Sequence, residues 1–452
     1  MNSPSLLQRA LPVLALALPS LAAAQSEPLF GPGGRYIFCG TQLAPPGGST
    51  GHMFTGPGDC AYASNYTGLE YDPEYLIEIP VVWHVLTTAS GFGDVTDQEI
   101  TDQMAILNAD YRPAFGAPGR DTGIQFRLAT TDPAGNPTTG ITRTANTTWF
   151  NDGGAYAANL AWDTTRYLNI YTMNPMGGGG VIGYVVDLPQ SGIVGIPDDG
   201  VRMLHSAIAS TDLNQVLAHE IGHYLGLYHT FGLTGACTNN SCQTQGDLIC
   251  DTNPHQGPSG FCANTQGSCA GLPTPINNFM NYQEEPCIFD FTPNQIQRMR
   301  CTLENYRSLL FTALPIGTPY CTATANSTGT IGLLEATGLD TVASNRFHLT
   351  ATNLPSGQFA FCIGSQTQSF VQNPGSSQGN LCLGGTLARF NTQVAPTTAG
   401  TYTATLDLTS FPLNPTAAVQ AGESWNFQCW HRDTLAGQPT SNFTQAVTVT
   451  FF

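Results

Sequence analysis

Three histidines with fixed spacing constrain this chain more than any other feature. Residues 219–231 have the sequence HEIGHYLGLYHTF. A helix turns about 100° per residue, so His219 and His223 lie on one face and can bind one metal ion. Gly226 can adopt the left-handed conformation that ends a helix, which lets the chain return His229 as a third ligand. Three protein ligands leave a fourth position open, as in catalytic rather than structural zinc sites.

The residues around this motif predict the helix and its chemistry. Glu220 follows the first histidine and points past the metal, which suits a general base acting on water. Asp212, followed three residues later by Gln215, predicts the N-terminal cap of the helix. The alternative is a helix whose histidines only fill surface or core positions. The extended spacing HExxHxxGxxH favours the catalytic interpretation.

The same spacing is the signature of the metzincin metalloproteases, which place a methionine in a tight turn beneath the metal. The sequence NNFMNY at 277–282 fits that turn, with Met280 as its methionine. Together with LGLYHTF, GDLICDT and FTPNQIQRMR, it resembles the pappalysin family, over about residues 39–310. The resemblance implies an α/β metzincin domain, with a twisted sheet, a zinc-binding helix and an irregular, disulfide-linked lower half. It also implies zinc-dependent cleavage of proteins or peptides.

The resemblance assigns roles to residues after the methionine. Tyr282 would donate a hydrogen bond to the oxyanion that develops on the scissile carbonyl, the alternative being an inert aromatic under the metal. Glu284 and Glu285 would line the pocket for an Arg or Lys after the scissile bond, although Pro286 takes the last position of that acidic stretch.

One cysteine is left over when the 13 cysteines of the chain form pairs. Cys39 is the candidate, because it lies in a CGT sequence like the one in pappalysin precursors. There the cysteine occupies the open zinc position and keeps the zymogen silent, and a thiolate is a good zinc ligand. The alternative is a disulfide with Cys60.

The N-terminus predicts export. Residues 1–24 have a short basic region, an apolar run and small residues at a cleavage site, as in a signal peptide; a membrane anchor is the weaker alternative. We expect a pro-segment at 25–69 and a catalytic domain at 70–313, with the activating cut between Cys60 and Tyr75. The net charge of −17 argues against nucleic acid and anionic membrane partners.

Hydrophobic periodicity predicts the elements of the catalytic domain. We expect strands at 77–87, 124–131 and 167–173, and helices at 96–111 and 291–311, the last with Thr292 as cap and Pro293 in its first turn. A glycine run at 177–180, beside an edge strand, would let a substrate backbone approach, or is a plain loop. His84, within a strand, is predicted to be structural.

The segment 232–275 is polar and rich in cysteine. By resemblance, Cys262 pairs with Cys287, and Cys269 pairs with Cys237 or Cys242. Oxygen ligands that calcium favours are also present, and the family suggests a structural calcium ion here; a solvated acidic loop is the alternative. The candidate calcium ligands are Asp247, Asp251 and Thr252.

The C-terminal third changes in composition. After a linker at 314–319, alternating strands separated by turn residues predict a β-sandwich at 320–452. Cys321, Cys362, Cys382 and Cys429 can form two bridges. The aromatic residues at 425–430 would provide stacking faces for a glycan or cell-surface partner, or belong to the core; a structural or anchoring module is favoured.

The sequence therefore predicts a secreted zinc endopeptidase made as a zymogen. Two alternatives differ in class. A zinc hydrolase of a non-peptide bond would use the same zinc and glutamate. A non-catalytic surface-binding protein would act through the β domain, but the intact Glu220 argues against it.

Overall fold

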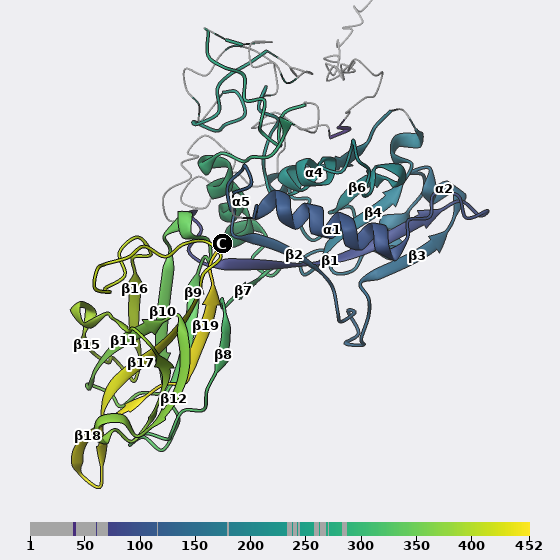
Figure 1. Cartoon of the computed structure of the whole chain (residues 1–452). Helices are drawn as coiled ribbons and strands as arrows, with labels where there is room; N and C mark the ends of the chain where they lie inside the picture. The colour runs from purple at the N-terminus through teal and green to yellow at the C-terminus, as the bar shows by residue number, and fades with distance from the viewer. Residues whose placement is uncertain are drawn as a thin grey trace, which may run out of the picture.

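The computed structural model describes residues 39–41, 60 and 71–452, except 115, 179, 233–236, 238–241, 243–244, 257–261, 263–267, 270 and 283–286. The predicted signal peptide, most of the predicted pro-segment, and Glu284 and Glu285 lie outside these residues. An N-terminal α/β domain is joined to an all-β domain (Figure 1). No helix in the described part of the chain is long and apolar enough to cross a membrane.

The N-terminal domain is built on a mixed seven-stranded sheet in the order β2-β1-β4-β6-β5, with β3 and β7 also pairing with β1. Strands β2, β3 and β4 run parallel to β1, β6 runs parallel to β4, and β5 and β7 are antiparallel to their neighbours. The strands are β1 Leu76–Thr87, β2 Ile124–Leu128, β3 Ile141–Ala145, β4 Leu168–Met173, β5 Gly183–Val185, β6 Val201–Leu204 and β7 Thr312–Leu314.

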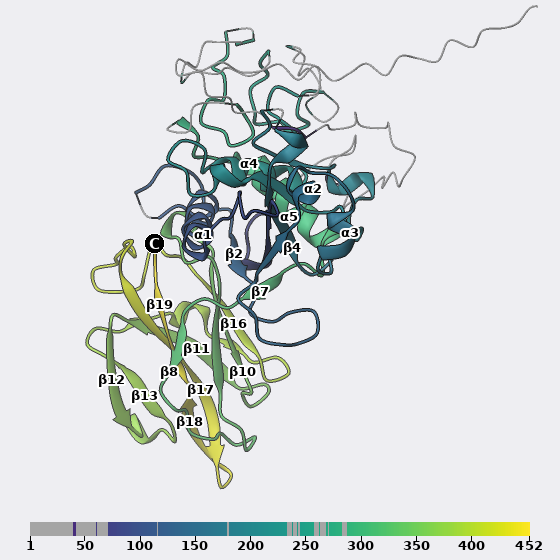
Figure 2. The ribbon, with the colours of Figure 1, turned by 90° about the vertical axis from the view of Figure 1, so that its right-hand side faces the viewer.

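Helices cover both faces of this sheet (Figures 1 and 2). Every second side chain along β1, including Ile79 and Trp83, packs into the main core with the helices α1, α4 and α5. On the opposite face, Leu86 and Tyr171 pack against α2 and α3. The helices are α1 Asp97–Tyr111, α2 Thr147–Phe150, α3 Tyr156–Leu160, α4 Val216–Tyr224 and α5 Pro293–Tyr306.

Local sequence signals explain where two of these helices begin. Thr96 caps α1 and Thr292 caps α5, and both form a capping box with the side chain three residues later. Pro293 then occupies the first turn of α5, where its missing amide is no loss. The predictions for both helices, and for strands β1, β2 and β4, are confirmed within a few residues, except that α5 ends at Tyr306 rather than at 311.

One local prediction is wrong. The helix α4 begins at Val216, and its N-cap is Gln215 with no side-chain capping hydrogen bond, so Asp212 is not the N-cap that the sequence predicted. Tertiary packing of this apolar helix, not a cap, fixes its start. The glycine run at 177–180 precedes the edge strand β5, whereas β4 before the run is internal in the sheet.

The C-terminal domain is a β-sandwich, as predicted, but its first strand begins at Thr318, within the predicted linker 314–319. A three-stranded sheet, β16-β10-β9, faces a seven-stranded sheet containing β14, β11, β17, β19 and β8, with β15 and β18 at its sides, and β12 and β13 form a hairpin. Its strands are β8 Thr318–Tyr320, β9 Leu333–Gly338, β10 Phe347–Thr352, β11 Phe359–Ser365, β12 Thr367–Gln372, β13 Asn380–Gly384, β14 Ala388–Arg389, β15 Ala395–Pro396, β16 Tyr402–Leu406, β17 Ser424–Leu435, β18 Gln438–Phe443 and β19 Ala446–Thr450.

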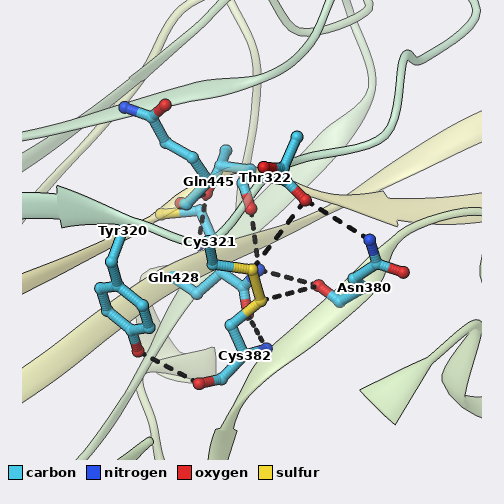
Figure 3. Close-up of a disulfide and its surroundings, with 9 residues drawn as sticks. Tyr320, Cys321, Thr322, Asn380, Cys382, Gln428 and Gln445 are labelled. Atoms are coloured by element: carbon cyan, nitrogen blue, oxygen red, sulfur yellow. Dashed lines mark hydrogen bonds between the residues drawn. A yellow bond between two sulfur atoms is a disulfide. The ribbon is translucent and has the colours of Figure 1, made fainter. Parts of the chain in front are cut away.

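Two disulfides and an aromatic core hold the sandwich together. Cys362 pairs with Cys429 between β11 and β17, and Cys321 pairs with Cys382 beside the Tyr320 hydroxyl, which donates to the Cys382 carbonyl at 3.1 Å (Figure 3). The aromatic residues at 425–430 divide between core and surface. Trp425 and Phe427 are buried between the sheets, whereas Trp430 is partly exposed. A glycan or surface contact through Trp430 stays a prediction.

The two domains share a continuous junction. Leu76, at the start of β1, packs into the core of the sandwich, and β7 ends at Leu314, only a few residues before β8. Arg346 of the sandwich pairs with Asp72 at 2.6 Å and with Glu74. The start of the α/β domain is therefore held by the β domain.

Candidate active site

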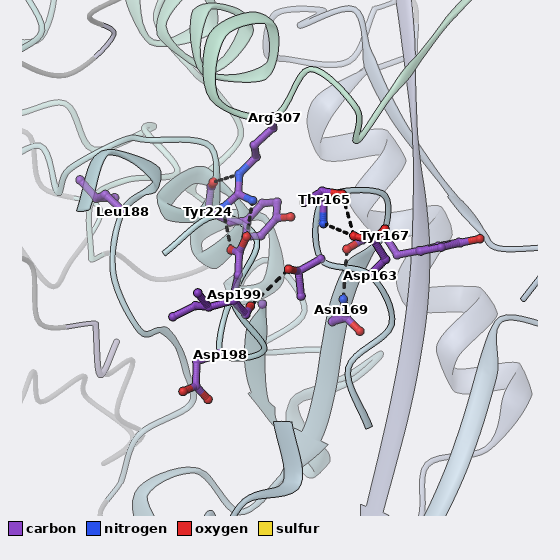
Figure 4. Close-up of polar contacts among 12 residues, drawn as sticks. Asp163, Thr165, Tyr167, Asn169, Leu188, Asp198, Asp199, Tyr224 and Arg307 are labelled. Carbon is purple, nitrogen blue, oxygen red and sulfur yellow. Dashed lines mark hydrogen bonds and ion pairs between the residues drawn. The ribbon is translucent and has the colours of Figure 1, made fainter. Parts of the chain in front are cut away.

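The position of helix α4 is fixed by a buried arginine at the end of α5. The guanidinium of Arg307 donates to both carboxylate oxygens of Asp199, at 2.6 and 2.7 Å, and to the carbonyl of Tyr224 at 3.1 Å (Figure 4). It also stacks on the Tyr224 ring, 3.6 Å from the ring centre. Because Tyr224 is the last residue of α4, these contacts tie the end of that helix to α5 and to the turn before β6.

Three imidazoles converge at the C-terminal half of α4. The Nε2 atoms of His219, His223 and His229 lie 3.0 to 3.2 Å apart in every pair. His219 Nδ1 donates to the Phe279 carbonyl at 2.6 Å, and His223 Nδ1 donates to the Leu227 carbonyl at 2.7 Å. These hydrogen bonds leave the Nε2 lone pairs directed at a common point.

The donor set fits zinc. Nitrogen ligands of a tetrahedral zinc at about 2.0–2.1 Å lie about 3.3 Å from one another, close to the separations seen here. Burial lowers the pKa of His219 to about 4, and burial and the neighbouring imidazoles lower the pKa values of His223 and His229 well below 6.5. Neutral imidazoles that point together without competing protons are what a metal ion requires.

The methionine turn lies directly below these histidines. A Cβ on Gly222, in the middle of α4, would be 2.3 Å from Met280 Sδ, so only glycine allows this approach. The Met280 carbonyl also accepts a hydrogen bond from the Thr230 amide at 3.0 Å. Gly226 has φ +94°, which provides the turn that returns His229. The histidine motif and the methionine turn therefore form one packed unit.

Glu220 and Tyr282 flank the metal position. Glu220 is fully buried, which raises the pKa of its carboxyl to about 8. Its Oε2 accepts hydrogen bonds from residues 39–41. The Tyr282 ring packs against His219 and His229. Its hydroxyl donates to the carbonyl of Cys39 at 3.4 Å, so it reaches a peptide carbonyl next to the metal position.

Residues 39–41 lie in this site. All 13 cysteines are among the described residues, and Cys39 alone has no disulfide. Its Sγ and the three histidine nitrogens lie within 4.8 Å of one another, and no other group of three or more metal-binding side chains is found in the described part of the chain. The Cys39 thiol also lies 3.4 Å from Glu220 Oε2.

The two residues after Cys39 bind the edge strand and the glutamate. The Gly40 amide donates to the Gly183 carbonyl of β5 at 2.8 Å, in parallel pairing. The Thr41 hydroxyl donates to Glu220 Oε2 at 3.1 Å and accepts from the Val185 amide at 3.0 Å. Sequence reasoning singled out Cys39 but missed the contact of Thr41 with the glutamate, although both belong to the same CGT sequence.

Disulfides organise the segment after the histidines. Cys262 pairs with Cys287, and Cys269 pairs with Cys237 rather than Cys242, which instead pairs with Cys250. Cys60 pairs with Cys301, not with Cys39. The structure thus selects between the alternatives that the sequence left open.

The candidate calcium ligands do not converge as a group. Asp247 is buried and accepts hydrogen bonds from the Thr252 hydroxyl at 2.8 Å, and burial raises its pKa to about 7. Asp251 instead accepts from the Asn294 amide in the first turn of α5. Calcium at these residues stays a prediction. His84 is structural, with ring nitrogens 2.8 Å from the Thr142 hydroxyl and 3.0 Å from the Asn169 side-chain oxygen.

Comparison with known proteins gives concordant results. Residues 152–304 match a peptidase M43 family model described as pregnancy-associated plasma protein-A. The chain is 34% identical over 245 residues to an extracellular metalloprotease of Colletotrichum graminicola, covering 51% of this chain and 78% of that protein. It is 31% identical over 307 residues to extracellular metalloprotease 1 of Coccidioides posadasii, covering 66% of this chain and 98% of that protein.

Solved structures with similarity to this chain include two forms of one protein of Tannerella forsythia. A mutant of promirolysin is 28% identical, covering 53% of this chain and 86% of that one, with a TM-score of 0.44. Mature mirolysin in complex with a cleaved peptide is also 28% identical, covering 52% and 98%, with a TM-score of 0.41.

Proposed function

Because this chain belongs to the pappalysin family of metzincin metalloproteases, we propose that it is a secreted endopeptidase that uses zinc, with Glu220 as general base and Cys39 as inhibitor of its precursor. The observation that carries the proposal is the convergence of three imidazole Nε2 atoms beside a buried glutamate on the same helix. The substrate is a protein or peptide, because the family hydrolyses peptide bonds.

The residues divide the chemistry among them. His219, His223 and His229 would hold the zinc, which when bound supplies Lewis acidity toward water and the scissile carbonyl. Glu220 accepts the proton of the attacking water and passes it to the leaving amine. The Tyr282 hydroxyl donates to the carbonyl oxygen as negative charge develops there. Its hydrogen bond to the Cys39 carbonyl supports this role, since that carbonyl is also part of an extended chain in the site.

Latency follows from the same contacts. Cys39 Sγ completes the set of four donors, the Thr41 hydroxyl occupies Glu220, and Gly40 pairs with the edge strand. A substrate would need each of these three positions. Removal of residues 39–41 would therefore expose the metal, the base and the strand together.

Digestion of a denatured protein mixture tests the function. The processed protein, with and without a zinc chelator, would be incubated with the mixture, and the new termini identified by mass spectrometry. We expect cuts that the chelator abolishes and added zinc restores, and Glu220→Gln as the matched control should bind zinc yet cut at least 10³-fold more slowly. Zinc-loaded, processed protein that leaves every peptide bond intact would refute the proposal. An Arg or Lys after the cuts would support the predicted roles of Glu284 and Glu285.

Secretion is supported by the naming of the relatives as extracellular and by the predicted signal peptide at 1–24. Export to an oxidising compartment also suits a chain with six disulfides. Mass analysis of the protein in culture medium checks this: we expect an N-terminus at or after residue 25.

A further inference from the structure

The segment before the α/β domain is attached to the enzyme at two places. Residues 39–41 lie in the active site, through the contacts of Cys39 and Thr41 with the metal position and Glu220. Cys60 forms a disulfide with Cys301 in helix α5. The 18 residues 42–59 connect the two places, and residues 61–70 connect the bridge to the start of the α/β domain.

The bridge is an integral part of the folded protein. Cys60 and Cys301 are 1% and 2% exposed and pack with Tyr71 and Tyr306 in a small cluster of their own. The Asn305 side-chain amide donates to the Cys301 carbonyl at 3.0 Å and to the Tyr71 hydroxyl at 3.3 Å. Reduction requires a thiolate to reach one of the sulfur atoms, so burial protects the bridge.

We propose that the Cys60–Cys301 bridge determines which cut activates the enzyme. Hydrolysis of one peptide bond between Thr41 and Cys60 separates the inhibitory residues from the enzyme. Hydrolysis of one bond between Cys60 and Tyr71 leaves them covalently attached through α5. This proposal rests on the proposed inhibition by Cys39, and it moves the activating cut upstream of the interval 60–75 that the sequence suggested.

The reason is effective concentration. After a cut beyond Cys60, residues 39–41 remain on a tether of 18 residues, which gives an effective concentration of about 1 mM. After a cut before Cys60, the released piece is only as concentrated as the enzyme, about 10 nM in an assay. The ratio favours rebinding of the tethered piece by about 10⁵-fold. Residues from Cys60 onward then belong to the mature enzyme.

Three full-length precursors test the proposal. Each carries one recognition sequence for a specific viral protease: within 42–59, within 61–70, or within 61–70 together with Cys60→Ser and Cys301→Ser. Each precursor is cut under non-reducing conditions, and the initial rate on a quenched peptide is measured at 10 nM. We expect activity from the first and third precursors, and at least 100-fold less activity from the second.

A second measurement does not depend on catalysis. In the Glu220→Ala background, the same cuts are followed by intact mass and by the rate of Cys39 alkylation. The second precursor should keep the mass of residues 39–60 and protect Cys39 as well as the uncut protein does, and it serves even if the double serine variant fails to fold. The proposal is overturned if Cys39 of the second precursor reacts at the rate of a denatured thiol.

The outcomes separate this proposal from the proposed function. Equal activity after either cut, with the bridge intact, would overturn only the role of the bridge. Inactivity of the first precursor after its cut, when it holds zinc and has lost residues 39–41, would overturn the protease function and this proposal with it.

Discussion

Arg307 offers a quantitative test of how helix α4 is held in place. Its side chain and that of Asp199 are only 1% and 2% exposed, and the pair is bidentate. Removing one member of a buried pair leaves an uncompensated charge and typically costs about 3–5 kcal/mol. We therefore expect Arg307→Met to lower the free energy of unfolding by about 3–5 kcal/mol.

The assay is denaturant unfolding of the Glu220→Ala precursor, which avoids self-cleavage. The matched control is the double variant Arg307→Met with Asp199→Leu, in which neither charge is buried alone. The Tyr224 carbonyl still loses its donor, which costs about 1–3 kcal/mol. We expect the double variant to be more stable than Arg307→Met by at least ~1 kcal/mol. A cost below about 1 kcal/mol for Arg307→Met would refute the reasoning. So would a double variant whose cost equals the sum of the costs of Arg307→Met and Asp199→Leu measured singly.

Three further predictions concern single residues. Burial lowers the pKa of His84 from 6.5 to about 4, so the unfolded chain binds the proton first. The free energy of unfolding should therefore fall by about 3 kcal/mol as pH decreases from 6.5 to 4. His84→Gln should flatten this part of the plot of unfolding free energy against pH, and an unchanged plot would exclude His84 as its source. In Gly40→Val, the new Cβ would lie 2.8 Å from Val181, so residues 39–41 should no longer fit in the site. Precursor activity should rise at least 10-fold, while the processed enzyme, which lacks this residue, is unchanged. A precursor that stays inactive would contradict this prediction. Gly222→Ala should cost about 1–3 kcal/mol in thermal or denaturant unfolding through its clash with the buried methionine, and the loss should shrink when Met280→Ala is added.

The start of a helix was predictable where the residues that fix it lie within a few positions of one another in the sequence. The capping boxes at Thr96 and Thr292 mark the beginnings of α1 and α5, because each satisfies backbone amides with its own side chains. Helix α4 has no such cap, and its first residue depends on packing against α1 and the sheet. No local pattern contains that information, which explains the wrong prediction at Asp212.

The part of the candidate site that depends on residue spacing along the sequence was predictable. The positions of His219, His223 and His229 follow from helix geometry and from one glycine turn. The disulfide partners of Cys60 and Cys269 did not follow, because they join segments 241 and 32 residues apart and depend on the tertiary fold. The contact of Thr41 with Glu220 is equally non-local.

Latency and catalysis, as proposed, draw on the same groups of the enzyme. Cys39 uses the open metal position, Thr41 uses the carboxylate of Glu220, and Gly40 uses the Gly183 carbonyl. A substitution on the enzyme side of any of these contacts must therefore change both inhibition and turnover. A substitution on the side of residues 39–41 changes inhibition alone, because these residues are absent after processing. Control of the precursor can thus vary in sequence without cost to the active enzyme, provided that Cys60 stays bonded to α5.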